Sequence, residues 1–261
     1  MDDEKMPLTE HLTELRKRVL IALGGLLAAF MISFNYSEDI FRLIMFPLRY
    51  ELDFSVRDMY AHFIQKDKLQ TTKLVFLAPA EAFWMNLKVA FVAGLLLALP
   101  LVFHQLWKFI SPGLHKNEKK YVAPFVFSST ILFLIGAAFC FFIVLPFAMG
   151  FLLTYKVGDV LMPMLSVGHY VDFCLKFILA FGAIFELPIV IIFLVRLGIV
   201  TPKTLARHRS YAVLISFIIA AALTPTPDAF NQTLMAVPMI VLYEIGIWVS
   251  PLFAKKKEQD G

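Results

Sequence analysis

Cysteine is nearly absent from this chain, and charged residues are few. Of 261 residues, 2 are cysteine and 17% are charged, whereas 59% are hydrophobic. Cys140 and Cys174 fall inside apolar runs and lack the spacing of zinc or redox sites, so we expect two small buried side chains. The six histidines are scattered along the sequence and form no metal-binding constellation.

Catalytic motifs are missing as well. The sequence has no Walker motif, no glycine-rich phosphate loop and no serine, histidine and aspartate arrangement, so we expect neither an ATPase nor another enzyme, and no cofactor or nucleic-acid partner. It has no internal repeat, which many secondary transporters show. We expect no cleavable signal peptide, because no small-residue cleavage site follows the apolar run that begins at Val19.

Apolar residues are abundant instead, and the mean hydropathy is +0.75. A soluble chain of this length cannot bury so much apolar surface in one core, so the bilayer is its expected solvent. The apolar residues form six runs: 19–34, 83–103, 121–149, 171–195, 211–223 and 234–249. The runs are too long and too uniform for barrel strands. The predicted fold is therefore all-α, with six transmembrane helices in a single domain over residues 1–261.

Basic residues are distributed unequally between the two sides of this predicted bundle. Of the 24 Lys and Arg residues, 15 lie in the segments on one side and 7 on the other. The richer side consists of segments 1–18, 104–120, 196–210 and 250–261. The positive-inside rule therefore predicts that both termini are cytoplasmic, with an N-terminal helix over 1–18, a loop over 104–120 and a tail over 251–261.

The last two apolar runs are short. A helix over 211–223 would span about 20 Å, less than the hydrocarbon core of about 30 Å. The prolines of the segment 224–228 (TPTPD) prevent its regular continuation. Alternatively, polar flanks extend both helices. The external loop 35–82 is unusually long, and we expect it to form short helices that cap the bundle.

Two carboxylates lie among basic residues, each just before a long apolar run. Glu14 precedes the first run, next to Arg16 and Arg18, and Glu118 precedes the third. A carboxylate at the membrane surface can pair bidentately with a guanidinium, so these two residues are candidates for binding a cationic partner. The alternatives are solvated charges on a lipid-anchored interfacial helix for the first, and stabilisation of a helix N-terminus for Glu118.

A third carboxylate, Glu186, lies in the fourth apolar run. A charged and unpaired carboxylate costs several kcal/mol near the bilayer centre, so we expect Glu186 to be protonated, paired or facing water. It is equally well explained as a neutral hydrogen-bonding group between helices. Lys88 and Lys176 also fall within apolar runs, and we expect them to extend their amines toward the membrane surface.

Several segments, in chain order, closely resemble the TatC family, the multi-spanning core subunit of the twin-arginine protein translocase. They are 7–18 (PLTEHLTELRKR), 105–118 (QLWKFISPGLHKNE), 181–188 (FGAIFELP), 223–232 (LTPTPDAFNQ), 236–239 (AVPM) and 243–246 (YEIG). The resemblance implies six helices in a concave bundle, with both termini cytoplasmic and short final helices. The chain departs from the family pattern mainly in its longer external loop, which has an additional stretch over 57–73.

The resemblance also implies a function. Proteins of this family bind twin-arginine signal peptides of folded precursors in the bacterial inner membrane. They assemble with the single-span subunits TatA and TatB into a hetero-oligomer driven by the proton motive force. By matching positions, signal-peptide binding is expected of Glu14, Arg16, Arg18, Phe109 and Glu118; Glu186 is an intramembrane polar site; Pro47, Asp228 and Gln232 belong to external loops. The alternative is a proton-coupled small-solute transporter that uses Glu186 as a proton relay.

Overall fold

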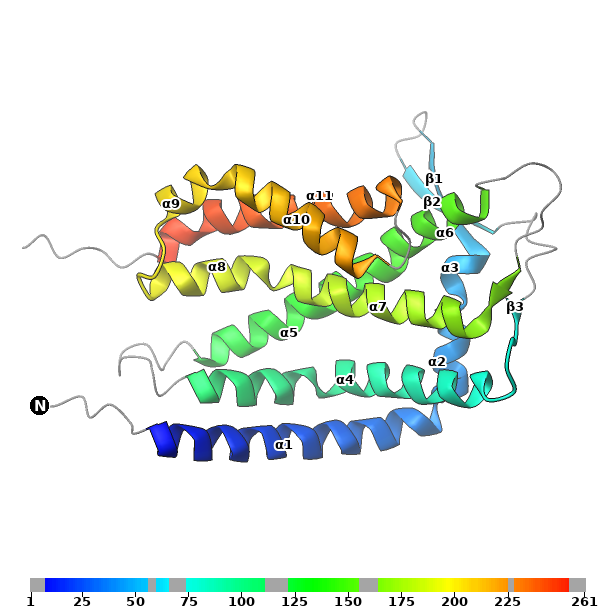
Figure 1. Ribbon diagram of the computed structural model, residues 1–261, viewed down its shortest axis with the longest axis horizontal. Coiled ribbons are helices and arrows are strands. Elements are labelled where there is room, and N and C mark those ends of the chain that lie inside the picture. The colour runs from blue at the N-terminus through cyan, green and yellow to red at the C-terminus, as the bar shows by residue number, and fades with distance from the viewer. Residues whose placement is uncertain are drawn as a thin grey trace, which may run out of the picture. The chain divides into compact units, whose positions relative to one another are not determined.

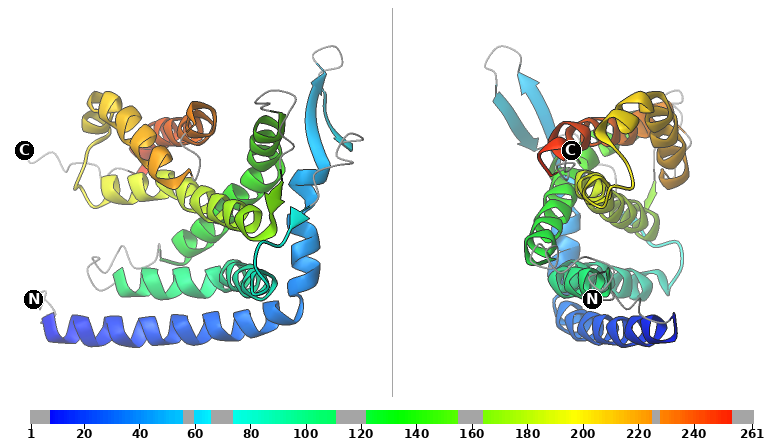
Figure 2. Two further views of the ribbon diagram at one scale, coloured as in Figure 1. Left: turned by 45° about the vertical axis from the view of Figure 1, so that its right-hand side comes forward. Right: turned by 90° about the vertical axis from the view of Figure 1, so that its left-hand side faces the viewer.

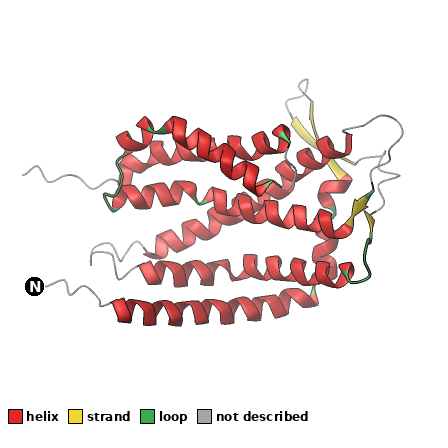
Figure 3. Cartoon of the chain, viewed as in Figure 1, coloured by secondary structure: helices red, strands yellow, loops and turns green. Residues whose placement is uncertain are grey.

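The computed structural model describes residues 8–55, 60–65, 74–110, 122–154, 164–224 and 228–253. Nearly all of this described chain is helical (Figure 3). It divides into two compact units. The first consists of Met1–Leu43 and Ala78–Ile131, and the second of Ile44–Leu77 and Leu132–Gly261.

The first unit is built on a pair of long antiparallel helices, α1 (Leu8–Asn35) and α4 (Glu81–Ile110) (Figure 1). Gly94 allows them to approach closely, because a Cβ at this position would lie 2.8 Å from the backbone N and Cα of Phe30. Small residues at such contacts are typical of helix pairs in membranes. Also in this unit are most of α2 (Ser37–Ile44) and the first part of α5 (Val122–Phe139).

The two faces of α1 are arranged opposite to those of a helix in a soluble protein. The apolar residues Leu12, Leu15 and Val19 are 63%, 37% and 46% exposed. Glu14 and Arg18 are half-buried. In a bilayer an apolar side chain gains nothing by leaving lipid for protein, so the polar stripe is the one that needs the neighbouring helix.

The second unit contains the remaining helices and the strands. Its helices are α3 (Phe46–Arg49), the end of α5, the π-helix η3 (Cys140–Val144), α6 (Leu145–Thr154), α7 (Val167–Phe185), α8 (Leu187–Arg196), α9 (Pro202–Arg207), α10 (Arg209–Leu223), α11 (Ala229–Val249) and the 3₁₀-helix η4 (Ser250–Phe253). Within it α11 packs against α8 and α10. Cys140 and Cys174 are both buried free thiols, as predicted.

Local sequence signals account for the helix ends here. Pro188 in the first turn of α8 breaks the long apolar run into α7 and α8 at Glu186. Gly198, with φ of +75°, ends α8, and the N–H of Ile199 donates to the carbonyl of Leu194 as in a Schellman motif. The hydroxyl of Thr201 then accepts a hydrogen bond from the N–H of Thr204 and caps α9.

Five helical stretches of the described chain are long and apolar enough to cross a membrane: Glu10–Asn35, Glu81–Ile110, Ala123–Leu153, Val167–Arg196 and Ala229–Phe253. A sixth, α10, is shorter. The six predicted helices are therefore confirmed. α10 has 15 residues and spans about 22 Å, as expected.

The expectation that the last helix is also short is wrong. α11 has 21 residues and spans about 31 Å, because the polar residues before the predicted apolar run already belong to it. Two other predicted boundaries shift for the same reason. The head and the first span form one helix from Leu8, and α4 runs on to Ile110, into the predicted loop.

The described part of segment 35–82 contains α2 and α3, as expected, but it also contains strands that the sequence analysis missed. β1 (Tyr50–Ser55) pairs antiparallel with β2 (Tyr60–Gln65), with Tyr50 opposite Gln65 and Ser55 opposite Tyr60 (Figure 2). A shorter parallel pair joins β3 (Leu74–Val75) to β4 (Leu165–Ser166). The fold is thus nearly all-helical rather than strictly all-α.

Candidate functional site

An ion pair lies on the half-buried stripe of α1. The Nη2 of Arg18 donates to the Oε1 of Glu14 at 3.0 Å, one helical turn away. The side chains of Arg18 and Glu14 are only 17% and 19% exposed. Partial burial weakens solvent screening, so the carboxylate can hold a guanidinium more firmly than a fully exposed one could.

A ring stack lies beside this ion pair. The imidazole of His11, one turn before Glu14 on α1, stacks on the ring of Phe109 in the last turn of α4. The centroids are 4.4 Å apart and the planes are inclined by 22°. Because α1 and α4 are antiparallel, the start of α1 and the end of α4 meet at this end of the first unit.

The structure thus brings together three of the five residues expected to bind a signal peptide: Glu14, Arg18 and Phe109. Arg16 lies on the same helix and is exposed. Glu118 lies outside the described residues. His11 was not singled out by the sequence analysis, although it lies within the quoted segment 7–18, because its partner is distant in the chain.

Glu186 lies in the second unit, at the break between α7 and α8. It ends α7 and precedes the first residue of α8, and its N–H donates to the carbonyl of Ala183 at 3.1 Å. Its side chain is half-buried. The position combines a carboxyl group with the loosened backbone that Pro188 causes, as expected from the sequence.

Asp228 and Gln232 lie together at the start of α11. Asp228 is the N-cap of the helix, and its two carboxylate oxygens accept from the N–H and the side-chain amide of Asn231, at 2.7 and 2.9 Å. The amide of Gln232 donates to the carbonyl of Phe217 in α10 at 3.0 Å. These contacts cap the start of α11 and tie it to α10.

Pro47 lies in the first turn of α3, where its fixed φ suits a helix start. It is fully buried. Nearby, the hydroxyl of Tyr170 in α7 donates to the carbonyl of Ile44, the last residue of α2, at 2.6 Å.

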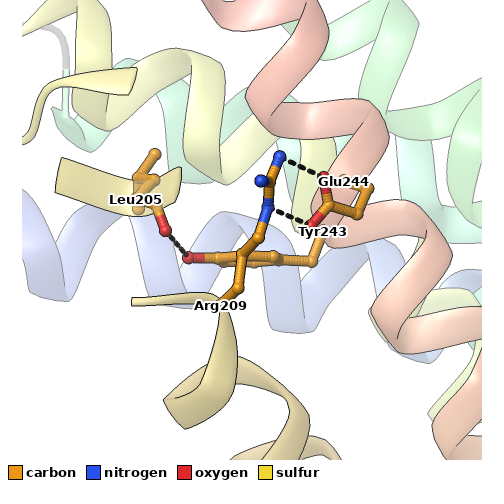
Figure 4. A network of polar contacts seen from close by, with 4 residues as sticks. All are labelled: Leu205, Arg209, Tyr243 and Glu244. Carbon is orange, nitrogen blue, oxygen red and sulfur yellow. Dashed lines mark hydrogen bonds and ion pairs between the residues drawn. The ribbon is translucent and has the colours of Figure 1, made fainter. Parts of the chain in front are cut away.

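A further polar network in the second unit was not anticipated (Figure 4). Arg209, at the start of α10, donates from Nε and Nη2 to the two carboxylate oxygens of Glu244 in α11, at 2.6 and 2.8 Å. The hydroxyl of the adjacent Tyr243 donates to the carbonyl of Leu205 in α9 at 3.0 Å. An arginine just before one apolar run and a carboxylate inside the next are the signal that could have revealed it.

No group of three or more His, Cys, Asp or Glu side chains within the described ranges could hold a metal ion. The side-chain groups that form the contacts described above are mainly carboxylates, guanidiniums and aromatic rings. Such groups bind by charge and stacking.

Comparison with known proteins decides the family. A family model described as Sec-independent protein translocase protein (TatC) matches residues 10–238. The chain belongs to the TatC family. It is 37% identical over 261 residues to the Sec-independent protein translocase protein TatC of Carboxydothermus hydrogenoformans, covering all of this chain and 99% of that protein. It is 42% identical over 247 residues to the TatC of Halothiobacillus neapolitanus, covering 95% of this chain and 63% of that protein.

Solved TatC structures agree with this. A crystal structure of the twin arginine translocase receptor TatC superposes with a TM-score of 0.78 at 35% identity, covering 92% of this chain and 99% of that one. A second crystal structure of the receptor gives a TM-score of 0.75 at the same identity. The chain is a multi-pass membrane component of a protein translocase and not an enzyme. This family assignment argues against the alternative function of a proton-coupled small-solute transporter.

Proposed function

We propose that the end of the α1–α4 pair that carries Glu14 and Phe109 binds twin-arginine signal peptides of folded precursor proteins. One observation carries the proposal: the Glu14 carboxylate already holds a guanidinium, that of Arg18, at 3.0 Å in a half-buried position. A site that binds an arginine of its own chain has the geometry and charge to bind one from a peptide.

Arginine and lysine differ at such a site. A guanidinium is planar and can engage both oxygens of a carboxylate, whereas an ammonium is a strongly hydrated point charge. Charge-assisted hydrogen bonds contribute about 1.5–3 kcal/mol each. A hydrogen bond to the second oxygen of Glu14 therefore contributes enough binding free energy to discriminate between a twin-arginine peptide and its twin-lysine variant. In this proposal Glu118 supplies the second anion, and Arg16 contributes to the same surface.

The ring stack gives the proposed site a second kind of contact. Phe109 is half-buried against His11, so its ring is held in place. A guanidinium can stack on such a ring, and the apolar part of a signal peptide can pack beside it.

In our proposal, this end of α1 and α4 faces the cytoplasm of a bacterial inner membrane. The support is the unequal distribution of Lys and Arg, with 15 of the 24 in the segments on this side. Both termini are then cytoplasmic. Family membership supports assembly with TatA and TatB into a hetero-oligomer that nucleates transport driven by the proton motive force, with Glu186 as an intramembrane polar site and Pro47, Asp228 and Gln232 contributing to assembly.

The test is photocrosslinking in membranes. A photoreactive residue at position 109 is combined with Glu14→Gln, and the chain is exposed to a twin-arginine signal peptide and to its twin-lysine variant. We expect strong crosslinking of the twin-arginine peptide, weak crosslinking of the twin-lysine peptide, and loss of the difference in Glu14→Gln.

Glu10→Gln provides the matched control, because Glu10 lies on the same helix one turn earlier and is exposed. This control should leave crosslinking unchanged. Equal crosslinking of the two peptides to the unmodified chain, or undiminished selectivity in Glu14→Gln, would contradict the proposal.

A further inference from the structure

Gln105 is a buried amide near the end of α4. The residue is 7% exposed, and its Oε1 has no hydrogen-bond partner within the described part of the chain. A buried acceptor without a partner costs about 1–3 kcal/mol. Such a group in a native protein requires an explanation. One explanation is that the acceptor gains a hydrogen-bond donor in another state of the protein, for example when a ligand is bound.

Two contacts give the register of α4 against α1 in this region. Leu101 meets Gly25, and Phe109 stacks on His11. Gln105 lies midway between Leu101 and Phe109, four residues from each. Residues at this spacing share one face of a helix, so Gln105 points toward α1 as they do.

The midpoint between His11 and Gly25 on α1 is Arg18. Arg18 is seven residues from each, which again places it on the same face of its helix. The register thus brings the buried amide of Gln105 to the level of the Glu14–Arg18 ion pair.

This ion pair is itself incompletely satisfied. It uses one oxygen of Glu14 and one terminal nitrogen of Arg18. The other carboxylate oxygen, Oε2, and the guanidinium Nε are both buried and have no hydrogen-bond partner among the residues that the structure describes. With Gln105 the region holds two acceptors and one donor in need of partners.

A single rearrangement satisfies all three atoms. We propose that Arg18 is an internal occupant of Glu14, that an incoming arginine displaces it, and that Gln105 Oε1 then accepts the hydrogen bond of Arg18 Nε–H. Both oxygens of Glu14 become available to the fork of the incoming guanidinium. This inference rests on the proposed function and adds to it a positioning residue, Gln105, which acts on peptide binding through Arg18.

The exchange predicts a specific effect of removing the amide acceptor. In Gln105→Met, which keeps the length of the side chain, displaced Arg18 has no acceptor and competes with the peptide for Glu14. We expect the affinity for a twin-arginine peptide to fall about tenfold, which corresponds to about 1.4 kcal/mol. Gln105→Glu keeps an acceptor for Arg18 and should bind at least as tightly as the unmodified chain.

The experiment measures fluorescence anisotropy of a labelled twin-arginine signal peptide with the full chain in lipid nanodiscs. Four variants are compared with the unmodified chain: Gln105→Met, Gln105→Glu, Arg18→Gln, and Gln105→Met combined with Arg18→Gln. Because Gln105 acts through Arg18, Gln105→Met should have no further effect in the Arg18→Gln background. An amide that served only to pack the two helices would weaken binding in both backgrounds.

Glu14→Gln separates the two proposals. If Glu14→Gln loses binding while Gln105→Met binds like the unmodified chain, the exchange is overturned and the proposed function stands. If Glu14→Gln binds normally, the proposed function itself fails. If Gln105→Met does not fold, Gln105→Glu still tests the exchange. A tenfold loss of affinity in Gln105→Glu also overturns it.

Discussion

The imidazole of His11 stacks on the ring of Phe109, with centroids 4.4 Å apart and planes inclined by 22°, and so joins the start of α1 to the end of α4. The two residues are nearly 100 positions apart in the sequence. The stack joins the two helices at the end of the pair where polar residues flank their apolar runs. It therefore holds the candidate binding residues at a fixed separation.

We expect the two rings to be energetically coupled. His11→Ala and Phe109→Ala should each lower the thermal unfolding temperature, and the double variant should lose less than the sum, with a coupling of about 0.5–1.5 kcal/mol. The measurement is a double-mutant cycle by thermal unfolding in detergent. Strictly additive losses would show that the stack contributes nothing beyond burial.

The close contact of α1 with α4 should be sensitive to a single methyl group. In Gly94→Ala the new Cβ would lie 2.8 Å from backbone atoms of Phe30, so the helices must separate. We expect a loss of about 1–3 kcal/mol in the free energy of unfolding, measured by denaturant titration in detergent micelles.

Gly24→Ala is the control for this variant. It adds the same methyl group on α1, where nothing lies within 4 Å of the new Cβ. Ala favours a helix over Gly by about 1 kcal/mol, so this variant should be neutral or more stable. Equal losses in Gly24→Ala and Gly94→Ala would contradict the role of close packing.

The bidentate pair of Arg209 and Glu244 should require arginine. Arg209→Lys keeps the charge but cannot form both hydrogen bonds, so its unfolding temperature should fall nearly as far as that of Arg209→Gln. Both groups are partly exposed, so the change is expected to be small, about 1 kcal/mol or less. Arg207→Lys, on the exposed end of α9, serves as the control. Full stability in Arg209→Lys would indicate that charge alone suffices.

Glu186 should tolerate Gln better than Ala. Gln keeps a hydrogen-bonding group at the break between α7 and α8, whereas Ala leaves the neighbouring polar groups without it. The measurement is export of a twin-arginine reporter protein in cells that carry each variant as their sole copy. Equally severe export defects in the two variants would argue that the negative charge itself is required.

The long apolar runs were predictable from the sequence because twenty or so apolar residues in lipid can satisfy their backbone groups only as a helix. The ends of the helices were not, since polar side chains continue a helix beyond the hydrocarbon. Ala229–Val249 and the last turns of α4 show this. The hairpin left a signal that was overlooked, because Tyr50, Leu52 and Phe54 alternate with polar residues at the period of a strand.

The candidate site was predictable in part for a similar reason. Glu14 and Arg18 lie one helical turn apart, so their pairing follows from the helix alone. The position of Gln105 depends on the register of two helices far apart in the chain, which no local pattern contains. The contact of Arg209 with Glu244 joins different helices in the same way.

α1 is an unbroken helix of 28 residues, about 42 Å long, whereas the hydrocarbon core is about 30 Å thick. The helix is therefore about 12 Å, or roughly eight residues, longer than this layer is thick, and Glu14 lies within its first eight residues. A helix without a kink moves as a lever. Any tilt of this helix at Glu14 therefore also displaces Asn35, about 32 Å farther along its axis.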